Sequence, residues 1–174
     1  MKPSQGDKDC DRAVPKGRGG GAFLLAQVGA HAASKFAERL AELDLVPAHA
    51  GILRILAARP ALTQQALAAT LGALPSRLVA LIDELESRGL LERRPHESDR
   101  RSYALHLTEA GKSSLQTIGR IAREHQQILL AALSQEEQQQ LAALLQRVAD
   151  QQGLTPQVHP GYASAERAAP SSKL

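Results

Sequence analysis

Hydrophobic and polar positions change their period twice between Thr63 and Thr108. Apolar residues first recur at the three- and four-residue spacing of a helix, then alternate with polar residues as in a strand, and then return to helical spacing. Turn-forming residues stand at these changes, with Gly72, Gly89 and Pro95 among them. This order predicts a helix, a turn, a second helix and a two-stranded hairpin.

The second helix of this unit has one apolar face and one polar face. Pro75 suits its first position, where the missing N–H loses no hydrogen bond, and Gly89 ends it because glycine adopts a left-handed conformation without a steric penalty. The apolar positions at helical spacing are Leu78, Leu81, Ile82 and Leu85. The opposite face carries short or polar side chains, namely Ser76, Arg77, Ala80 and Glu84. Such a face fits against base edges in a DNA groove.

Two strands are expected after this helix, over 90–94 and 102–107, with 95–101 as the hairpin loop. The second strand alternates Tyr103, Leu105 and Leu107 on one face against Ser102, Ala104 and His106 on the other. A further short edge strand is expected at 61–62. The hairpin would form the wing of a winged-helix unit.

Helical spacing also predicts the elements on either side of this unit. A first amphipathic helix covers 22–43, and a second begins at Pro47 and ends at 59–60, because proline disfavours helical geometry in the residue before it. Thr63 is the expected cap of a helix over 64–71. Thr108 is the expected cap of a long helix over 109–133. Ser134 and Glu137 form a capping box that starts a sixth helix, which ends at Gly153.

The run GLLERRPHESDRRSYALHLTEAG over 89–111 resembles the wing of the multiple-antibiotic-resistance regulator (MarR) family of bacterial winged-helix transcription factors. That family's signature is a Gly-Leu ending the recognition helix, an Arg closing the first strand, an Asp-x-Arg in the wing, and Leu-Thr-x-x-Gly opening a long helix. The matching residues are Gly89 and Leu90, Arg93 or Arg94, Asp99 and Arg101, and Leu107, Thr108 and Gly111. The resemblance covers about 22–153. One departure is Leu74, where the family usually has a polar capping residue.

The resemblance implies a mainly α (α+β) winged-helix fold with about six helices and a two- or three-stranded β-wing. The winged helix-turn-helix is expected over 47–108, with dimerisation helices over 22–43 and 109–152. The apolar faces of these terminal helices exceed what one winged module covers, which favours a homodimer. A two-fold dimer reads a near-palindrome whose half-sites lie about 10 base pairs apart. The glycine-rich, basic segment 1–21 and the proline-containing segment 154–174 are expected to be tails.

Composition narrows the class of protein further. The 174 residues suit one domain, and 43% hydrophobic residues with only 2% aromatics and no Trp predict an aliphatic core. A net charge of +3 is compatible with nucleic acid. The single cysteine, Cys10, excludes an internal disulfide, and no apolar run approaches the roughly 20 residues of a membrane span. With no secretory signal recognisable, a bacterial cytoplasmic protein is expected.

The expected DNA contacts fall on the recognition helix and the wing. Pro75 starts the helix that would place Ser76, Arg77 and Ala80 near bases in the major groove. Arg100 or Arg101 would enter the minor groove, where the negative potential favours a guanidinium. Asp99 would hold an arginine in place. The other candidates are Arg93 and Arg94 for phosphates and His96 in the wing. For each arginine the alternative is a solvated surface charge.

The resemblance also suggests a small aromatic or phenolic effector, bound between the dimer helices and the DNA-binding lobe, that releases a repressor from DNA. Candidate lining residues are Phe23, His31 and Arg54, and His31 and His125 are the histidines placed to border such a crevice or to bind zinc. A structural or solvent-facing role is the alternative for each histidine.

No catalytic residue, cofactor motif or metal-ligand spacing is recognisable, so the sequence predicts a regulator and no enzyme. One alternative is a winged-helix module that binds another protein without touching DNA; the polar, cationic wing favours DNA. A redox-responsive regulator is another. Redox-sensing relatives carry a reactive cysteine in the first helix, near tyrosine partners. The matching position here is about Ala22, and Ala26 stands where a tyrosine partner would be. The only cysteine, Cys10, lies in the tail.

Overall fold

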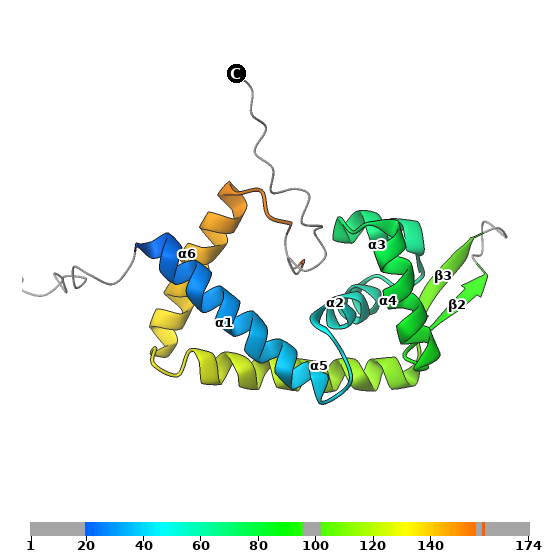
Figure 1. Ribbon diagram of the computed structural model, residues 1–174, viewed down its shortest axis with the longest axis horizontal. Helices are drawn as coiled ribbons and strands as arrows, with labels where there is room; N and C mark the ends of the chain where they lie inside the picture. The colour runs from blue at the N-terminus through cyan, green and yellow to red at the C-terminus, as the bar shows by residue number, and fades with distance from the viewer. Residues whose placement is uncertain (1–19, 96–101, 156–157, 159–174) are drawn as a thin grey trace, which may run out of the picture.

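The computed structural model describes residues 20–95, 102–155 and 158 (Figure 1). The helices are α1 (Gly21–Ala41), α2 (Pro47–Ala58), α3 (Gln64–Leu71), α4 (Pro75–Ser87), α5 (Glu109–Leu129) and α6 (Gln135–Gln151). The strands are β1 (Leu62–Thr63), β2 (Leu91–Pro95) and β3 (Tyr103–Leu107). The six expected helices and the winged arrangement are confirmed. Helix α5 runs from the lobe that contains α2, α3, α4 and the sheet to the turn before α6 (Figure 1).

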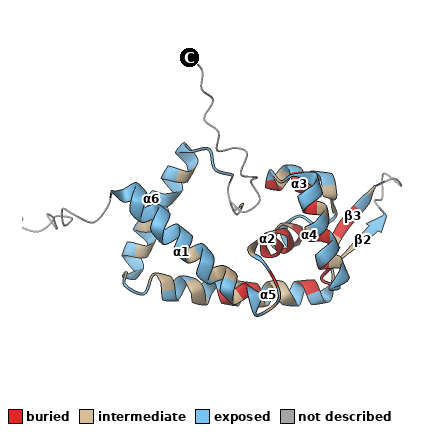
Figure 2. Ribbon diagram, viewed as in Figure 1, coloured by how far each residue is buried: buried red, intermediate tan, exposed pale blue. Residues whose placement is uncertain are grey.

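The hydrophobic core lies inside this lobe. It is aliphatic, as the composition predicts, and its members come mainly from α2, α3, α4, β2 and β3 (Figure 2). The ten largest fully buried side chains are Leu40, Ile52, Leu53, Leu56, Leu67, Leu78, Ile82, Leu85, Leu91 and Leu105. Each such burial contributes roughly 1.5–3 kcal/mol relative to an exposed side chain. Leu40 from α1 and Ile118 from α5 join the same core, so the lobe is attached to both long helices.

Local signals set the helix-turn-helix corner. The Thr63 hydroxyl accepts a hydrogen bond from the Ala66 N–H at 3.2 Å and begins α3, as predicted. Gly72 ends α3 in the left-handed conformation, with φ of 59°. The chain then bends by 116° between α3 and α4. Leu74 precedes α4 in an extended conformation and supplies no side-chain cap.

The sheet is antiparallel, with the strand order β1-β3-β2. Leu105 of the central strand pairs with Leu62 on one side and with Arg93 on the other. The predicted alternation along β3 is wrong in part, because Ala104 and Leu105 are both buried while Tyr103 is 58% exposed. Helices α2, α3 and α5 all contact β3, and Tyr103 lies beyond the end of β1.

Helix α5 ends at Leu129, four residues before the predicted end at Leu133. The turn that follows is held by a contact that sequence spacing does not reveal. The Gln138 side-chain amide of α6 donates to the carbonyl oxygens of Leu130 and Leu133, at 3.2 and 3.1 Å. These bonds satisfy carbonyl groups of the turn between the helices. The predicted capping box that starts α6 is confirmed, with Ser134 and Glu137 exchanging side-chain to backbone hydrogen bonds.

The terminal helices expose apolar side chains. No described residue of α6 is buried, and α1 buries only Leu40 (Figure 2). The large exposed apolar side chains of α1, α5 and α6 are Phe23, Leu24, Leu25, Val28, Ile128, Leu144, Leu145 and Val148. Within the described ranges no single helix has the length and apolar character to cross a membrane; α3 and α4 satisfy that test only as a bent pair, by length and composition.

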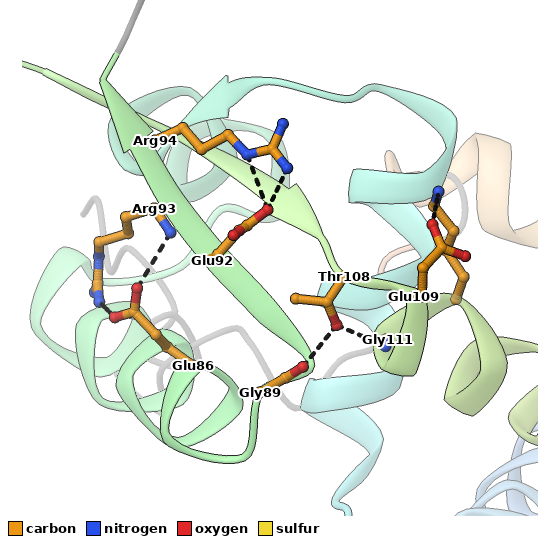
Figure 3. A network of polar contacts seen from close by, with 9 residues as sticks. Glu86, Gly89, Glu92, Arg93, Arg94, Thr108, Glu109 and Gly111 are labelled. Carbon is orange, nitrogen blue, oxygen red and sulfur yellow. Dashed lines mark hydrogen bonds and ion pairs between the residues drawn. The ribbon is translucent and has the colours of Figure 1, made fainter.

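One polar junction connects four elements of the lobe (Figure 3). The Thr108 hydroxyl donates to the Gly89 carbonyl oxygen at 2.6 Å and accepts from the Gly111 N–H at 3.0 Å. The Thr108 N–H donates to the Leu90 carbonyl oxygen at 3.2 Å. A Cβ atom on Gly111 would overlap that same Leu90 oxygen. The junction therefore joins the end of α4, the start of β2, the end of β3 and the first turn of α5.

We expect Gly111→Ala to destabilise the fold by about 1–3 kcal/mol, because the new methyl group meets backbone and forces α5 away from Leu90. Gly119→Ala on the same helix is the control. There a Cβ meets only the tip of Arg123 at 3.5 Å, so the better helix propensity of alanine should stabilise by about 0.5–1 kcal/mol. Chemical denaturation measures both. Equal stabilisation by the two substitutions would contradict the proposed close packing.

Candidate nucleic-acid interface

The first half of α4 faces solvent. Its three inward side chains, Leu78, Ile82 and Leu85, are completely buried and hold the helix against the core. The four residues expected to meet DNA from this helix are all exposed in the structure: Pro75, Ser76, Arg77 and Ala80. Pro75, Ser76 and Arg77 belong to the first turn, so this exposed surface begins where the chain leaves the helix-turn-helix corner.

The second half of α4 is acidic and holds Arg93 of β2 (Figure 3). The Arg93 guanidinium lies 2.5 Å from the Asp83 carboxylate and also pairs with Glu86. The Arg93 N–H donates to the same Glu86 carboxylate at 3.1 Å. Burial alone lowers the pKa of Arg93, but the hydrogen bonds and charges of the two carboxylates raise it above its ordinary value. Arg93 therefore joins the wing to α4, and only 23% of its side chain is exposed.

Arg94 lies differently from its neighbour. Its side chain is 60% exposed and pairs with Glu92 of the same strand at 2.5 Å (Figure 3). Exposed ion pairs of this kind contribute about 0–1 kcal/mol to folding stability, so Arg94 can exchange Glu92 for another partner at little cost. The remaining wing candidates, His96, Asp99, Arg100 and Arg101, lie outside the described residues.

The end of α4 is anchored by residues that the sequence analysis did not single out. The Arg88 guanidinium donates to the backbone carbonyl oxygens of Leu43, at 2.7 Å, and Asp44, in the link between α1 and α2. His49 of α2 is 3% exposed, and its Nε2 lies 3.0 Å from the Glu84 carboxylate. His49 Nδ1 accepts from the Val46 N–H at 3.4 Å. An arginine near a helix end and a histidine in a first turn are too common in surface roles to have identified this anchor.

The residues proposed to bind an effector separate into two places. A cavity of about 220 Å³ lies between α1, α2 and α5, lined by Phe36, Pro47, Ala50, Gly51, Arg54, Leu115, Ile118, Gly119 and Ala122. His31 instead lines a more open groove of about 720 Å³ between α1 and α5, with Lys35, Arg39 and His125 among its other residues. Phe23 is 61% exposed and lines neither of them.

Two residues that line this groove, His125 and Arg39, contact neighbouring side chains of α1 and α5. The rings of His125 and Phe36 lie 5.6 Å apart, between centroids. Burial, with smaller contributions from Arg39 and His31, lowers the pKa of His125. Arg39 pairs with Glu124 at 2.5 Å and so joins α1 to α5. The described residues hold no cluster of three or more His, Cys, Asp or Glu side chains arranged for a metal ion.

Comparison with known proteins places this geometry in a family. The model of the MarR family matches residues 43–102. A Thauera aromatica protein described as a putative transcriptional regulatory protein for the hcr operon is 34% identical over 112 residues, which is 64% of this chain and 68% of that protein. The chain belongs to the MarR family. It is a DNA-binding transcriptional regulator and has no enzymatic role.

Solved structures of other MarR-family regulators share the fold. The transcriptional repressor CouR bound to a 23-mer DNA duplex is 32% identical, with a TM-score of 0.66 over 74% of this chain and 91% of CouR. A mutant of Escherichia coli MarR complexed with operator DNA is 25% identical, with a TM-score of 0.64 over 73% of this chain and 91% of that one. A mutant of Staphylococcus aureus MepR reaches a TM-score of 0.68 at 25% identity, over 76% of this chain and 98% of MepR.

The His49 anchor predicts a pH dependence of stability. Burial lowers the pKa of His49 in the folded protein, despite the opposing charge of Glu84. The unfolded chain therefore binds a proton first as the pH falls below about 6.5, and folding stability decreases from there until the folded-state pKa is reached. Above about 6.5 the contribution is fully present.

We expect His49→Gln to lose less stability than the wild type between pH 7.5 and 5, measured by urea denaturation at each pH. His125→Gln is the comparison at a second histidine whose pKa is lowered by burial; it lies on α5, in the groove between α1 and α5. Parallel stability curves for the wild type and His49→Gln would show that this histidine does not titrate differently on folding.

Proposed function

We propose that the chain is a transcriptional repressor that binds a near-palindromic operator as a homodimer and is released by a small aromatic ligand. The observation that carries this proposal is the division of α4. Its second half is held by Arg93, Arg88 and His49, whereas Ser76, Arg77 and Ala80 in its first half are exposed. A helix held firmly at one end presents the other to a major groove in a defined orientation.

The occupant proposed for the exposed apolar faces of α1, α5 and α6 is a second copy of this chain. Eight large apolar side chains of these helices are exposed, and burial between two copies removes them from water. The proposed division is 22–43 and 109–152 for dimerisation and 47–108 for DNA binding. Two-fold symmetry then sets the two α4 helices about one helical turn of DNA apart.

The proposed DNA contacts differ in kind. Arg77, at the start of α4, is assigned to a base edge together with Ser76 and Ala80. Arg94 and the wing residues His96, Arg100 and Arg101 are assigned to phosphates or the minor groove, with Asp99 holding an arginine. Arg93 is assigned a positioning role, because two carboxylates of α4 already occupy its guanidinium.

A binding titration tests the proposed interface. Arg77→Ala should cost roughly 1–3 kcal/mol per base contact and relax sequence preference. Arg101→Ala should instead weaken binding to operator and scrambled duplex alike, and should lower the slope of log K against log salt by about 0.9 for each phosphate contact removed. A symmetric dimer loses two such contacts. Unchanged affinity and salt slope for Arg101→Ala would exclude the wing from the complex.

The dimer has its own test. Leu144 of α6 is 55% exposed, and Leu144→Glu should give monomers that no longer bind operator, because a charge in an apolar interface is costly. Gln139→Glu adds the same charge to an exposed position on the opposite side of α6 and should remain dimeric. Sedimentation velocity distinguishes the two. A dimeric, DNA-competent Leu144→Glu variant would contradict the assignment of this face.

For the effector, the 220 Å³ cavity is favoured over the open groove. It lies between the lobe and the long helices, its size suits a single aromatic ring, and its lining includes the cationic side chain of Arg54. A ligand here contacts α2, which also carries His49 against Glu84 of α4. The name of CouR, a transcriptional repressor, supports a repressor role for this chain as well.

Thermal shift with benzoate and hydroxybenzoates at millimolar concentration tests the effector site. A ligand that binds the folded state raises the melting temperature by mass action. We expect the shift to disappear in Arg54→Ala and to persist in His31→Ala. The reverse result would move the site to the open groove, and no shift with any of these acids would leave the aromatic effector without support.

A further inference from the structure

Leu74 stands out on the DNA-facing surface because it is a large apolar side chain where a polar one is preferred. It occupies the N-cap of α4, is 49% exposed, and makes no side-chain cap. Ser, Thr, Asp and Asn are favoured at such positions because their oxygens accept a hydrogen bond from the first helical turn. Leu74 gives up that bond and also leaves half of its surface in water. Neither property contributes to folding.

The surroundings of Leu74 are small and mostly apolar. It borders a hollow of about 640 Å³ between α3 and the start of α4, with Ala69, Gly72, Ala73 and Pro75 also lining it, and Gln64 and Gln65 at one edge. The next exposed residues along the chain are Pro75, Ser76 and Arg77, and the last two are proposed base contacts. Leu74 therefore belongs to the same surface that α4 would bring to DNA.

Among the described residues, the outward surface of α4 has few hydrogen-bonding groups for base edges. Arg88 and Arg93 are held within the lobe, and Asp83 is paired with Arg93. Glu84 lies against His49, and the Ser87 hydroxyl donates to the Glu84 carbonyl oxygen. In the first turns of the helix, Ser76 and Arg77 remain as polar candidates, while Ala80 contributes only a methyl group. Such a surface gains sequence preference from apolar contacts as well as from hydrogen bonds.

We propose that Leu74 is a specificity-determining residue that reads thymine through the C5 methyl group in the major groove. Thymine alone among the four bases carries a methyl group there. Against any other base edge, a leucine side chain would remove water from a donor or acceptor without replacing its hydrogen bond, which is unfavourable. The contact thus attracts thymine and disfavours the alternatives. This inference rests on the proposed placement of α4 in the major groove.

Deoxyuridine is the direct probe, because it differs from thymidine only in the missing methyl group. The operator is first obtained by selection from a random duplex pool with the full chain. Each thymine is then replaced by deoxyuridine at the symmetric positions of both half-sites, and affinity is measured for the wild type and Leu74→Ser. Serine restores a capping side chain, so this variant is expected to fold.

At one thymine position per half-site, the substitution should weaken wild-type binding by about fourfold for each methyl group and about 15-fold for the symmetric pair. The same substitution should leave Leu74→Ser nearly unaffected. Val46→Ser is the matched control, since Val46 is also an exposed apolar N-cap before a proline, at the start of α2. It should keep the wild-type response to deoxyuridine.

Two failures are distinguishable. If the wild type selects an operator but Leu74→Ser shows the same loss at every deoxyuridine position, the thymine contact is wrong while operator binding stands. The same holds if Leu74→Ser relaxes preference at a position that is not thymine. If the wild type enriches no duplex at all, the proposed operator binding fails and this inference fails with it.

Discussion

The junction around Thr108 is the constraint on which the rest of the lobe depends. Its hydroxyl and N–H bond the backbone of Gly89 and Leu90, and its hydroxyl also caps α5 through Gly111. Because Gly111 has no side chain, α5 approaches the Leu90 carbonyl oxygen closely enough to close the junction. The end of the recognition helix, both wing strands and the long helix are thereby hydrogen-bonded to one another at a single point. A change in the position of α5 would therefore act on the wing and on the end of α4 together.

The two halves of helix α4 have different roles, one in packing and one in the proposed DNA contact. Its second half carries the acidic residues that bind Arg93 and contact His49, and these contacts fix the helix against β2 and α2. Arg88 adds a bond to the link between α1 and α2. Its first half carries the exposed side chains that are proposed to meet DNA. The acidic half would repel phosphates if it approached them, so the charge pattern also favours docking by the N-terminal end.

The proposed regulation requires that a ligand distinguish two spacings of the recognition helices in the proposed dimer, and the shift it causes cannot exceed its differential affinity for them. The cavity with Arg54 is suited to that role because its walls come from α1, α2 and α5. Helix α2 forms one wall and also contacts α4 through His49 and Glu84. Arg39 and Glu124 join α1 to α5 nearby. A ligand that alters the packing of α2 against α5 would therefore act on the recognition helix through short, direct contacts.

The sequence by itself determined the order and type of the elements, because turn residues such as Gly72 and the Ser134 capping box act within one or two turns of the chain. The family signature likewise predicted the winged fold. Contacts between distant segments were decided only by the tertiary structure. Arg93 was expected at a phosphate but lies between two carboxylates, and Arg54 and His31 were grouped together yet line different cavities. Residue type specifies what a side chain is able to bind, whereas its partner depends on how helices far apart in the sequence pack. That packing is a property of the folded chain, since no local pattern encodes which side chains meet.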